Sequence, residues 1–356
     1  MAERNGNPTI KDVAKHCGVS IATVSAVLNR AAWVPAETRA RIQQAIEQIG
    51  YRPNRLARSL KTRQSYSVGV IVSDITNPFF NDIVRNLSHV LYQHDRNLIL
   101  CDSDHRFDLG ASNFHMLLEK QVDAIVLIGD SVSAEELGAY LLRPQPVPVV
   151  AIERDYELDG VNKLLIDSER SAFEATQHLV EQGYDRIGMI SGPQRGPGSG
   201  SYGQMQFERG YRRALEAAGL PYQDVLVAEG DFRYGGGQQA MRRLLALHTP
   251  PQAIFAANDM MALGAIQVAH EQRLHIPEDI AVVGYDDIPM AAQTLPPLTT
   301  LAVPRWEIAE AAADVLLAQL KDPSTHPPVR RMFTASLVVR ASSVLPQAAA
   351  ADGTPA

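Results

Sequence analysis

The sequence predicts a small all-α head at the N-terminus, a linker, and a two-lobed α/β body with two doubly wound parallel sheets. Two observations lead to this fold class. Short helix-length segments with a basic balance occupy residues 1–61, and apolar runs alternate with amphipathic segments from residue 67 onward. The length of 356 residues also exceeds that of one typical domain, so we expect at least two separately folding parts.

Three helix-length segments make up the head: TIKDVAKHCG, GVSIATVSAVLN and AETRARIQQAIEQIGY. Thr9 and Ser20 are typical N-terminal caps, and Gly18 and Gly50 are typical of helix ends. A helix, a tight turn containing glycine and a second helix form a helix-turn-helix, in which the second helix enters the major groove of DNA. The head is therefore a predicted DNA-binding domain.

The second of these helices is expected to turn its valines toward the core of the head and its other residues outward. Short polar side chains on the outward side suit phosphate oxygens, which position a protein on DNA without reading its sequence. Each polar residue taken alone is also explained as a cap or as an ordinary exposed position. The candidate DNA contacts of these helices are Thr9, Ser20, Ile21, Ala22, Thr23, Ser25, Ala26 and Asn29.

Charge is distributed unevenly along the chain. The net charge is −7, yet residues 1–61 hold ten Lys and Arg residues against four Asp and Glu residues. The rest of the chain carries 23 basic and 36 acidic residues. A basic head on an acidic body places the expected polyanion-binding surface on the head.

The segment RPNRLARSLKTRQS, residues 52–65, is basic and has only Leu56 and Leu60 as bulky apolar residues. This composition indicates a linker with a latent helix, and a flexible basic linker is the alternative. Ordering of such a segment costs conformational entropy.

From residue 67, apolar strands alternate with amphipathic helices, which predicts parallel sheets. About nine strands exceed one typical sheet, so we expect two similar lobes that meet near residues 160–165. Ligands of open parallel sheets bind at the carboxyl ends of the strands, which makes the cleft between the lobes the expected ligand site. The predicted strands are SVGVIVS, LILCD, VDAIVLIG, PVPVVAI, NKLLID, RIGMISG, DVLVAEG, QAIFAAND and DIAVVGYDD.

The segment SDITNPFF ends the first predicted strand and starts a helix, with Asn77 as cap and Pro78 at the first helical position. We expect one of Phe79 and Phe80 in the core. The other is then a candidate surface on which a sugar ring or a base stacks.

Polar residues follow other predicted strands. Asn258 and Asp286 suit the paired hydroxyls of a polar small molecule, although capping of a helix by Asn258 and of a loop by Asp286 also explains them. Arg154 is similarly placed and suits an acidic or hydroxylated ligand. These residues are candidate ligand contacts.

The sequence shows no motif for catalysis, for a cofactor or for a metal. GPGSGSYG lacks the lysine of a phosphate-binding loop, YGGGQQ lacks the dinucleotide glycine spacing, and no serine sits in a G-x-S-x-G elbow. The ten histidines are scattered, and no pair has metal-ligand spacing on a helix. We therefore predict a protein that is not an enzyme and that holds no cofactor.

Cys17 and Cys101 are the only cysteines and lie in a predicted helix and a predicted strand, so no disulfide is expected. The N-terminus lacks an apolar signal-peptide core, and no apolar run approaches the roughly 18–20 residues of a membrane span. We expect a cytoplasmic protein.

Three segments carry a family resemblance: TIKDVAKHCGVSIATVSAVLN, VPAETRARIQQAIEQIGYRPNRLARSLKTRQS and VGVIVSDITNPFF. They resemble the LacI/GalR family of bacterial transcription regulators, densely over residues 9–80. The looser segments SGP, AAND, GYDD and PLTTL extend the resemblance to about residue 340. It implies a periplasmic-binding-protein-like body and a homodimer on double-stranded operator DNA.

The resemblance also implies roles for residues. PNRLARSL matches a hinge that becomes helical on DNA, where Leu60 wedges into the minor groove and kinks the duplex. It adds Thr38, Tyr51, Asn54, Arg55, Arg58 and Leu60 to the candidate DNA contacts. The resemblance also implies effector contacts, and Arg154 joins them because it follows a predicted strand. Together these residues are Phe79, Phe80, Arg154, Arg195, Phe232, Asn258 and Asp286.

Two positions depart from the family pattern. Many members have arginine or another polar residue where this chain has Ala26, so one base-reading contact worth roughly 1–3 kcal/mol is missing. Phe207 stands where members often carry an effector-binding arginine, and the nearby glycine-rich segment is longer than usual. Arg195 and Arg209 are the two candidate substitutes for that arginine.

These observations predict a transcriptional repressor whose operator affinity is controlled by a small polar effector, a sugar or sugar derivative. The alternatives are a solute-binding protein of the periplasmic type and an α/β enzyme acting on a sugar or nucleotide. The expected domains are 1–51 helix-turn-helix, 52–65 hinge, 66–340 effector binding and dimerisation, and 341–356 disordered tail. The first lobe is expected at about 66–161 plus 298–324, and the second at about 162–297 plus 325–340.

Overall fold

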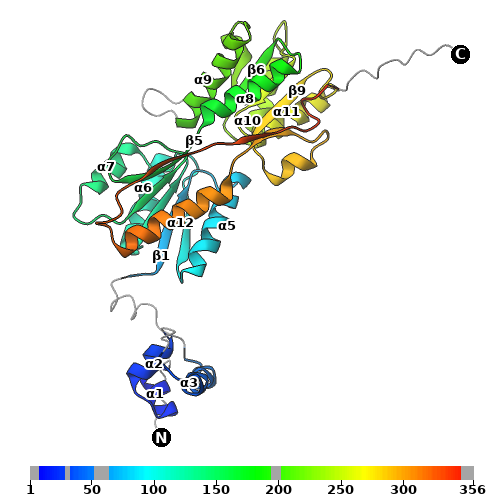
Figure 1. The fold of residues 1–356 in the computed structure, drawn as a ribbon. Helices are drawn as coiled ribbons and strands as arrows, with labels where there is room; N and C mark the ends of the chain where they lie inside the picture. Colours follow the sequence, from blue (N-terminus) through cyan, green and yellow to red (C-terminus); the bar gives the residue numbers. More distant parts are fainter. Residues whose placement is uncertain (1–7, 29–32, 52–63, 194–201, 346–356) are drawn as a thin grey trace, which may run out of the picture. The chain divides into compact units, whose positions relative to one another are not determined.

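The computed structural model describes residues 8–28, 33–51, 64–193 and 202–345. Its internal contacts divide the chain into a head, Met1–Ser65, and a body, Tyr66–Ala356 (Figure 1).

The head contains the three predicted helices: α1 (Ile10–Cys17), α2 (Ile21–Leu28) and α3 (Ala36–Ile49). Gly18 and Gly50 follow α1 and α3 with φ of 62° and 68°, the left-handed conformation that ends helices. Val13, Val24 and Ile42 are fully buried in the shared core of these helices. The predicted helix-turn-helix is therefore confirmed as a fold.

The first lobe of the body is a parallel sheet of six strands in the order β11-β5-β4-β3-β1-β2. Four helices accompany it: α5 (Pro78–Gln93), α6 (Phe107–Glu119), α7 (Ala134–Leu141) and α12 (Arg305–Lys321). Its strands are β1 (Ser67–Val72), β2 (Asn97–Asp102), β3 (Ala124–Ile128), β4 (Val149–Ile152), β5 (Val161–Ile166) and β11 (Arg330–Phe333).

The second lobe repeats this architecture in the order β12-β10-β9-β8-β6-β7, with β12 antiparallel to β10. Its strands are β6 (Ile187–Ser191), β7 (Val227–Glu229), β8 (Ala253–Ala256), β9 (Ala281–Asp286), β10 (Thr299–Ala302) and β12 (Ser336–Val338). Its helices are α8 (Ser168–Glu181), α9 (Tyr202–Ala217), α10 (Tyr234–Leu245) and α11 (Asp259–Glu271), with 3₁₀ turns at Asp224–Leu226 and Pro289–Gln293.

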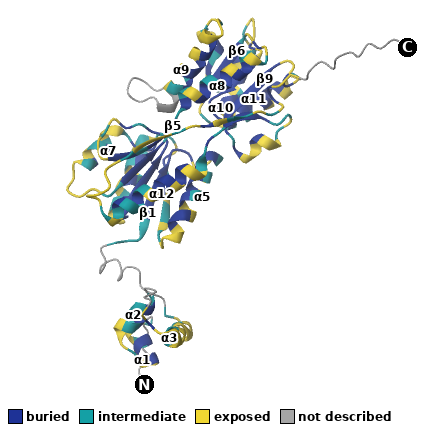
Figure 2. Ribbon diagram, in the orientation of Figure 1, coloured by how far each residue is buried: buried dark blue, intermediate teal, exposed yellow. Residues whose placement is uncertain are grey.

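Both faces of the sheets are covered, which explains why the predicted strands are continuously apolar. In β3, Val126 joins the buried cluster that includes residues of α5 and α12, whereas Ile125 and Leu127 join the cluster on the opposite face with Phe114. Figure 2 shows the strands as the most buried elements of the body. All nine predicted strands are present as β1 to β9.

The strands near the lobe boundaries belong to other lobes than the sequence predicted. We expected residues 162–297 and 325–340 in the second lobe, but β5 and β11 belong to the first sheet. We expected residues 298–324 in the first lobe, but β10 pairs with β9 of the second sheet, and α12 then packs on α5. Periodicity shows that a strand is buried, whereas the sheet that it joins depends on partners far away in sequence.

The tail was expected to be disordered from residue 341, and this was wrong for its first residues. Ser342 Oγ donates to the carbonyl oxygen of Val282 at 2.5 Å and accepts from the N–H of Thr299 at 2.8 Å. Ser343 Oγ lies 2.8 Å from His178 Nε2. Small polar residues suggested disorder by composition, but these two serines are hydrogen-bonded to the second lobe.

Within the described ranges, no helix is both long enough and apolar enough to cross a membrane. The same part of the chain has no cluster of His, Cys, Asp and Glu side chains arranged to hold a metal ion.

Candidate functional site

The turn of the helix-turn-helix is fixed by short-range hydrogen bonds. The Asp12 carboxylate accepts from the N–H and the hydroxyl of Thr9, at 2.8 and 2.7 Å, at the start of α1. Ser20 Oγ accepts from the N–H of Thr23 at 3.1 Å and lies 2.8 Å from the Thr23 hydroxyl. Ser20 therefore caps α2.

The exposed side of α2 is smaller than we expected. Ile21 and Ala22 are exposed, Thr23 and Ser25 are half-buried, and Ala26 is half-buried and packs against the core of the head. The outward position expected for Ala26 is therefore wrong in part, because the helix packs closely enough for its small side chain to join the core. Ile21 and Ala22 are thus the most exposed of the predicted α2 contacts.

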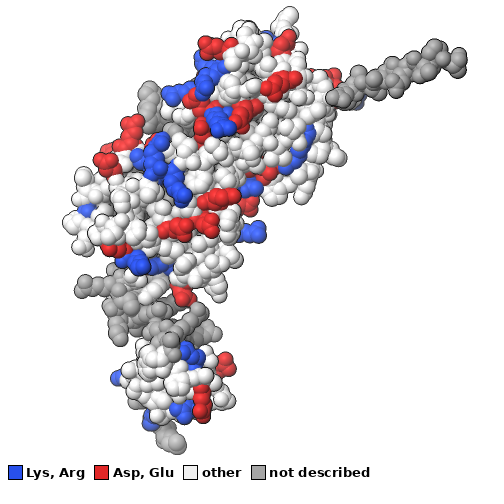
Figure 3. Space-filling model, in the orientation of Figure 1, with Lys and Arg blue, Asp and Glu red and all other residues white. Residues whose placement is uncertain are grey.

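The other predicted DNA contacts fall into two groups. Thr38 and Tyr51 are half-buried on the head, where Tyr51 also packs against its core. Figure 3 shows Lys and Arg side chains on the surface of the described head. The remaining predicted DNA contacts lie outside the described residues: Asn29, Asn54, Arg55, Arg58 and Leu60.

The body encloses a cavity between its two lobes, at the carboxyl ends of the parallel strands. Its empty volume, including the part open to solvent, is about 570 Å³. Five predicted effector contacts line it: Phe79, Phe80, Phe232, Asn258 and Asp286. The other lining residues are Ser73, Asn77, His105, Gly129, Asp130, Glu153, Phe207, Ala257 and Tyr285.

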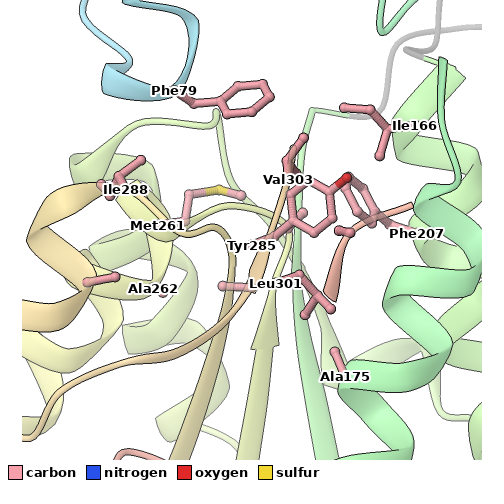
Figure 4. Close-up of a cluster of buried hydrophobic side chains, with 14 of the residues drawn as sticks. Phe79, Ile166, Ala175, Phe207, Met261, Ala262, Tyr285, Ile288, Leu301 and Val303 are labelled. Atoms are coloured by element: carbon pink, nitrogen blue, oxygen red, sulfur yellow. The ribbon is translucent and has the colours of Figure 1, made fainter. Parts of the chain in front are cut away.

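Aromatic rings form the apolar part of the cavity. The centroids of Phe79 and Phe80 lie 5.3 Å apart, so both rings reach the cavity from the first turn of α5. Phe207 packs edge-on against Tyr285 with centroids 4.8 Å apart. Figure 4 shows these two rings side by side, with Phe79 extending from the first lobe toward the same region. We expected one of the two phenylalanines in the core, and both are buried yet also line the cavity.

Helix-capping amides lie beside these rings. Asn77 Oδ1 accepts from the N–H of Phe79 at 3.0 Å, which fixes the start of α5. Asn258 Oδ1 caps α11 by accepting from the N–H of Met261 at 2.9 Å, and its amide nitrogen donates to the carbonyl oxygen of Phe232 at 2.8 Å. Capping and cavity lining therefore coexist in Asn258.

Three carboxyl groups line the cavity: those of Asp130, Glu153 and Asp286. Burial, with a further contribution from Asp130, raises the pKa of Glu153 to about 8. Burial, together with Asp259 and Glu153, raises the pKa of Asp286 well above its ordinary value. A raised pKa in a pocket is typical of a functional group.

Arg154 does not line the cavity. Its guanidinium forms an ion pair with Asp130, which does line it, and lies over the ring of Tyr156 at 5.3 Å. The predicted contact of Arg154 with the ligand therefore differs from the others, because its guanidinium is engaged by Asp130 outside the cavity lining. Arg195 lies outside the described residues.

Glu153, the neighbour of Arg154, was not among the ligand contacts predicted from the sequence. Glu153 has φ of 61°, so the chain turns sharply after β4. Because of this turn, the Glu153 side chain lines the cavity and the Arg154 side chain does not. Phe207 was not predicted to line the cavity either, although its position was noted as a departure from the family pattern. The signal available for both was their position near the ends of strands and helices that meet at the cleft.

Ionisation of Glu153 should make the body less stable as the pH rises. The folded state holds a proton on Glu153 up to about pH 8, whereas the unfolded chain loses it near the ordinary value of 4.5. Stability is therefore full below that value and falls as the pH rises toward 8, by at most about 1.4 kcal/mol per pH unit for this group. Urea unfolding between pH 5 and 8 should show a shallower decline for Glu153→Gln than for the unchanged protein. The exposed Glu157→Gln serves as control, and equal slopes for all three proteins contradict this account.

An ion-pair network joins the two lobes at the edge of the cavity. Arg233, just before α10 in the second lobe, donates from Nε to Asp74 Oδ2 of the first lobe at 3.0 Å. It also pairs with Asp104 of the first lobe. Burial opposes ionisation of Asp74, but hydrogen bonds from Thr76 and Arg233 outweigh it and lower the pKa of Asp74. The ring of Phe232 stacks on His105 next to this network, with centroids 6.2 Å apart.

Arg233→Gln should weaken ligand binding by favouring separation of the lobes. Because the Arg233 side chain is 45% exposed, we expect a loss of about 1 kcal/mol, roughly fivefold in affinity. Isothermal titration with a cavity ligand measures this. Arg242→Gln is the matched control, because Arg242 pairs with Glu271 at 2.9 Å within the second lobe. Equal losses in the two variants would show that the Arg233 network does not hold the lobes together.

Two family models match the chain. The model "Bacterial regulatory proteins, lacI family" matches residues 9–54, and "Periplasmic binding protein-like domain" matches residues 176–343. The first match covers the described helices of the head, and the second covers most of the second lobe.

Curated and solved relatives extend over nearly the whole chain. The ribose operon repressor of Escherichia coli strain K12 is 36% identical over 338 residues, which is 94% of this chain and 99% of the relative. The regulator CelR in complex with cellobiose is 32% identical, covers 94% of this chain and 99% of its own, and has a TM-score of 0.70. The lac repressor dimer bound to operator and an anti-inducer is 26% identical, covers 96% and 100%, and has a TM-score of 0.82.

Proposed function

We propose that this chain, which belongs to the LacI family of bacterial regulatory proteins, is a dimeric repressor whose cavity binds a sugar or sugar derivative. As a member of that family, it is a DNA-binding transcription regulator that responds to a small-molecule effector. The cavity between the lobes carries this proposal, since aromatic rings and polar groups meet there at the carboxyl ends of two parallel sheets. A member of this family of regulators is not an enzyme.

In this proposal, the head binds operator DNA through the helix-turn-helix. Ile21 and Ala22 contact bases, with apolar contacts to thymine methyl groups as their available chemistry. Thr9, Ser20, Thr23, Ser25, Thr38 and Tyr51 are the proposed contacts to the DNA backbone. Direct base reading is sparse, so we assign much of the operator selectivity to deformation of the DNA.

We assign that deformation to the hinge, residues 52–65, with Leu60 as the minor-groove wedge and Asn54, Arg55 and Arg58 near phosphates. Support comes from the likeness of the chain to the operator-bound lac repressor dimer over 96% of its length. Residues 1–51 are the proposed DNA-binding domain and 66–340 the effector-binding and dimerisation domain. The operator is chromosomal DNA, so we propose a cytoplasmic protein.

The effector would act by changing the relative stability of two arrangements of the lobes. A ligand shifts such an equilibrium only through its different affinity for the two states. Phe79, Phe80, Phe232, Asn258 and Asp286 are the proposed contacts, drawn from both lobes, so an occupant of the cavity touches both. Arg233 already ties the lobes at the cavity edge, so a ligand that adds contacts across it favours closure.

Deletion of residues 1–61 tests the division of labour between head and body. An operator fragment is first selected from random duplexes with the full chain. The shortened protein should lose retardation of this fragment completely, while its affinity for a cavity ligand stays unchanged. The phosphate contacts predict that retardation by the full chain weakens steeply with salt. Retardation by the shortened protein would contradict the assignment of DNA binding to the head.

A further inference from the structure

The cavity is acidic, and the charges come from both lobes. Asp130 and Glu153 of the first lobe and Asp286 of the second lobe line it. None of the described lining residues is a lysine or an arginine. An anionic ligand would therefore meet carboxyl groups without a compensating cation from the described lining.

The nearby guanidinium groups are already engaged by other groups. Arg154 pairs with Asp130, and Arg340 pairs with Asp287 at 2.7 Å. Arg305 donates to the backbone carbonyl oxygens of Asp286 and Asp287, at 3.1 and 3.0 Å, rather than to the Asp286 carboxylate. Around the cavity, the described arginines thus leave the carboxyl groups of Glu153 and Asp286 unpaired.

The Asp286 side chain is the clearest case. It is only 3% exposed, lines the cavity, and has no side-chain hydrogen bond to any described residue. The Glu153 carboxyl likewise has no hydrogen bond within the described part of the chain, and it lies close enough to Asp286 to raise its pKa. Burial of an unpaired carboxylate is costly, so the pKa of Asp286 is raised and that of Glu153 is raised to about 8.

The rest of the lining suits a cation. The rings of Phe79, Phe80, Phe207, Phe232 and Tyr285 all line the cavity. An organic ammonium group is attracted to the face of such rings within about 6 Å, and more strongly when water is excluded. Aromatic rings beside unpaired carboxyl groups suit both the ring and the ammonium group of an amino sugar.

On the basis of the proposed function, we propose that the effector of this cavity is an amine-bearing polyol, such as an amino sugar. Its ammonium group pairs with Glu153 and Asp286, and its ring packs on the aromatic lining. The hydroxyl groups of the same molecule bond to the remaining polar lining, including Asn258 and Ser73. Binding transfers a proton from the carboxyl pair to the buffer, because the ammonium group favours their ionised forms.

Isothermal titration of the full chain with matched sugars at pH 7 tests this proposal. The probes are D-glucosamine, D-glucose, N-acetyl-D-glucosamine and D-glucuronate, and the pair N-methyl-D-glucamine and D-glucitol. We expect each amine to bind at least about tenfold more tightly than its neutral partner, and the acid to bind most weakly. The heat of amine binding should depend on the ionisation enthalpy of the buffer, and the heat of neutral-sugar binding should not.

Glu153→Gln should remove most of the preference for the amine over its neutral partner, and Glu157→Gln on the exposed surface should leave it unchanged. Retained DNA retardation and a cooperative thermal melting transition show that each variant is folded. A neutral or acidic probe that binds as tightly as the amine, or no binding of any amine, overturns the proposal. The proposed function is judged separately by DNA retardation, so a regulator controlled by a neutral sugar would contradict this inference alone.

Discussion

Replacing Ile42 with alanine should abolish operator binding and leave ligand binding by the body unchanged. Ile42 is fully buried in the head, at the centre of a core built from three short helices. Such a truncation costs about 2–5 kcal/mol, and a domain of this size seldom has more than about 3–5 kcal/mol of stability. The head should therefore unfold at 25 °C, with operator affinity falling at least about a hundredfold. Gel retardation and isothermal titration on the same protein measure the two activities.

Ile21→Ala is the matched control, since it removes the same atoms from a side chain that is 45% exposed on α2. Its stability should change by less than about 0.5 kcal/mol, whereas its preference among operator variants with and without thymine should change. If Ile21→Ala unfolds the head, or if Ile42→Ala still binds the operator normally, the assigned core and reading surface of the head are wrong.

Replacing Asp286 with asparagine should have two opposite effects on the body. Ligand affinity should fall about 10- to 100-fold, because a hydrogen bond to a charged group is lost. The thermal midpoint of the ligand-free body should rise, because the substitution removes a buried acid whose pKa is raised by burial and by its acidic neighbours Asp259 and Glu153. Operator binding without effector should be unchanged.

Asp287→Asn, one residue further along, should give the reverse result. Asp287 accepts from Arg340 at 2.7 Å and is not part of the cavity lining. Its replacement should lower the thermal midpoint without weakening ligand binding. The two neighbouring variants therefore distinguish a residue kept for ligand binding from one kept for stability. Normal ligand affinity in Asp286→Asn would contradict the assigned site.

Local patterns were sufficient to predict the elements of this fold. The first nine strands were predicted because strands of doubly wound sheets are buried on both faces and are continuously apolar. The strands β10 to β12 have three or four residues each, too few to show a period. Their exchange between the lobes was not predictable either, because it depends on pairing between residues such as Leu165 and Met332, which are far apart in sequence.

The cavity was predicted in part for a similar reason. The position of Asp286 and Asn258 after strands was visible in the sequence, and both line the cavity. The sequence did not show that Glu153 lines the cavity and that Arg154 does not. This difference depends on a backbone turn and on the pairing of Arg154 with Asp130. Whether these lining residues bind the effector remains a prediction that the variants above test.

The most direct test of effector control is the operator affinity of the full chain, measured with and without a saturating cavity ligand found by thermal-shift screening. We predict that the ligand changes operator affinity by about 5- to 150-fold, and that operator DNA changes ligand affinity by the same factor. Asp286→Asn should show neither change at the same ligand concentration. Equal operator affinities of the unchanged protein with the cavity empty and filled would contradict the account.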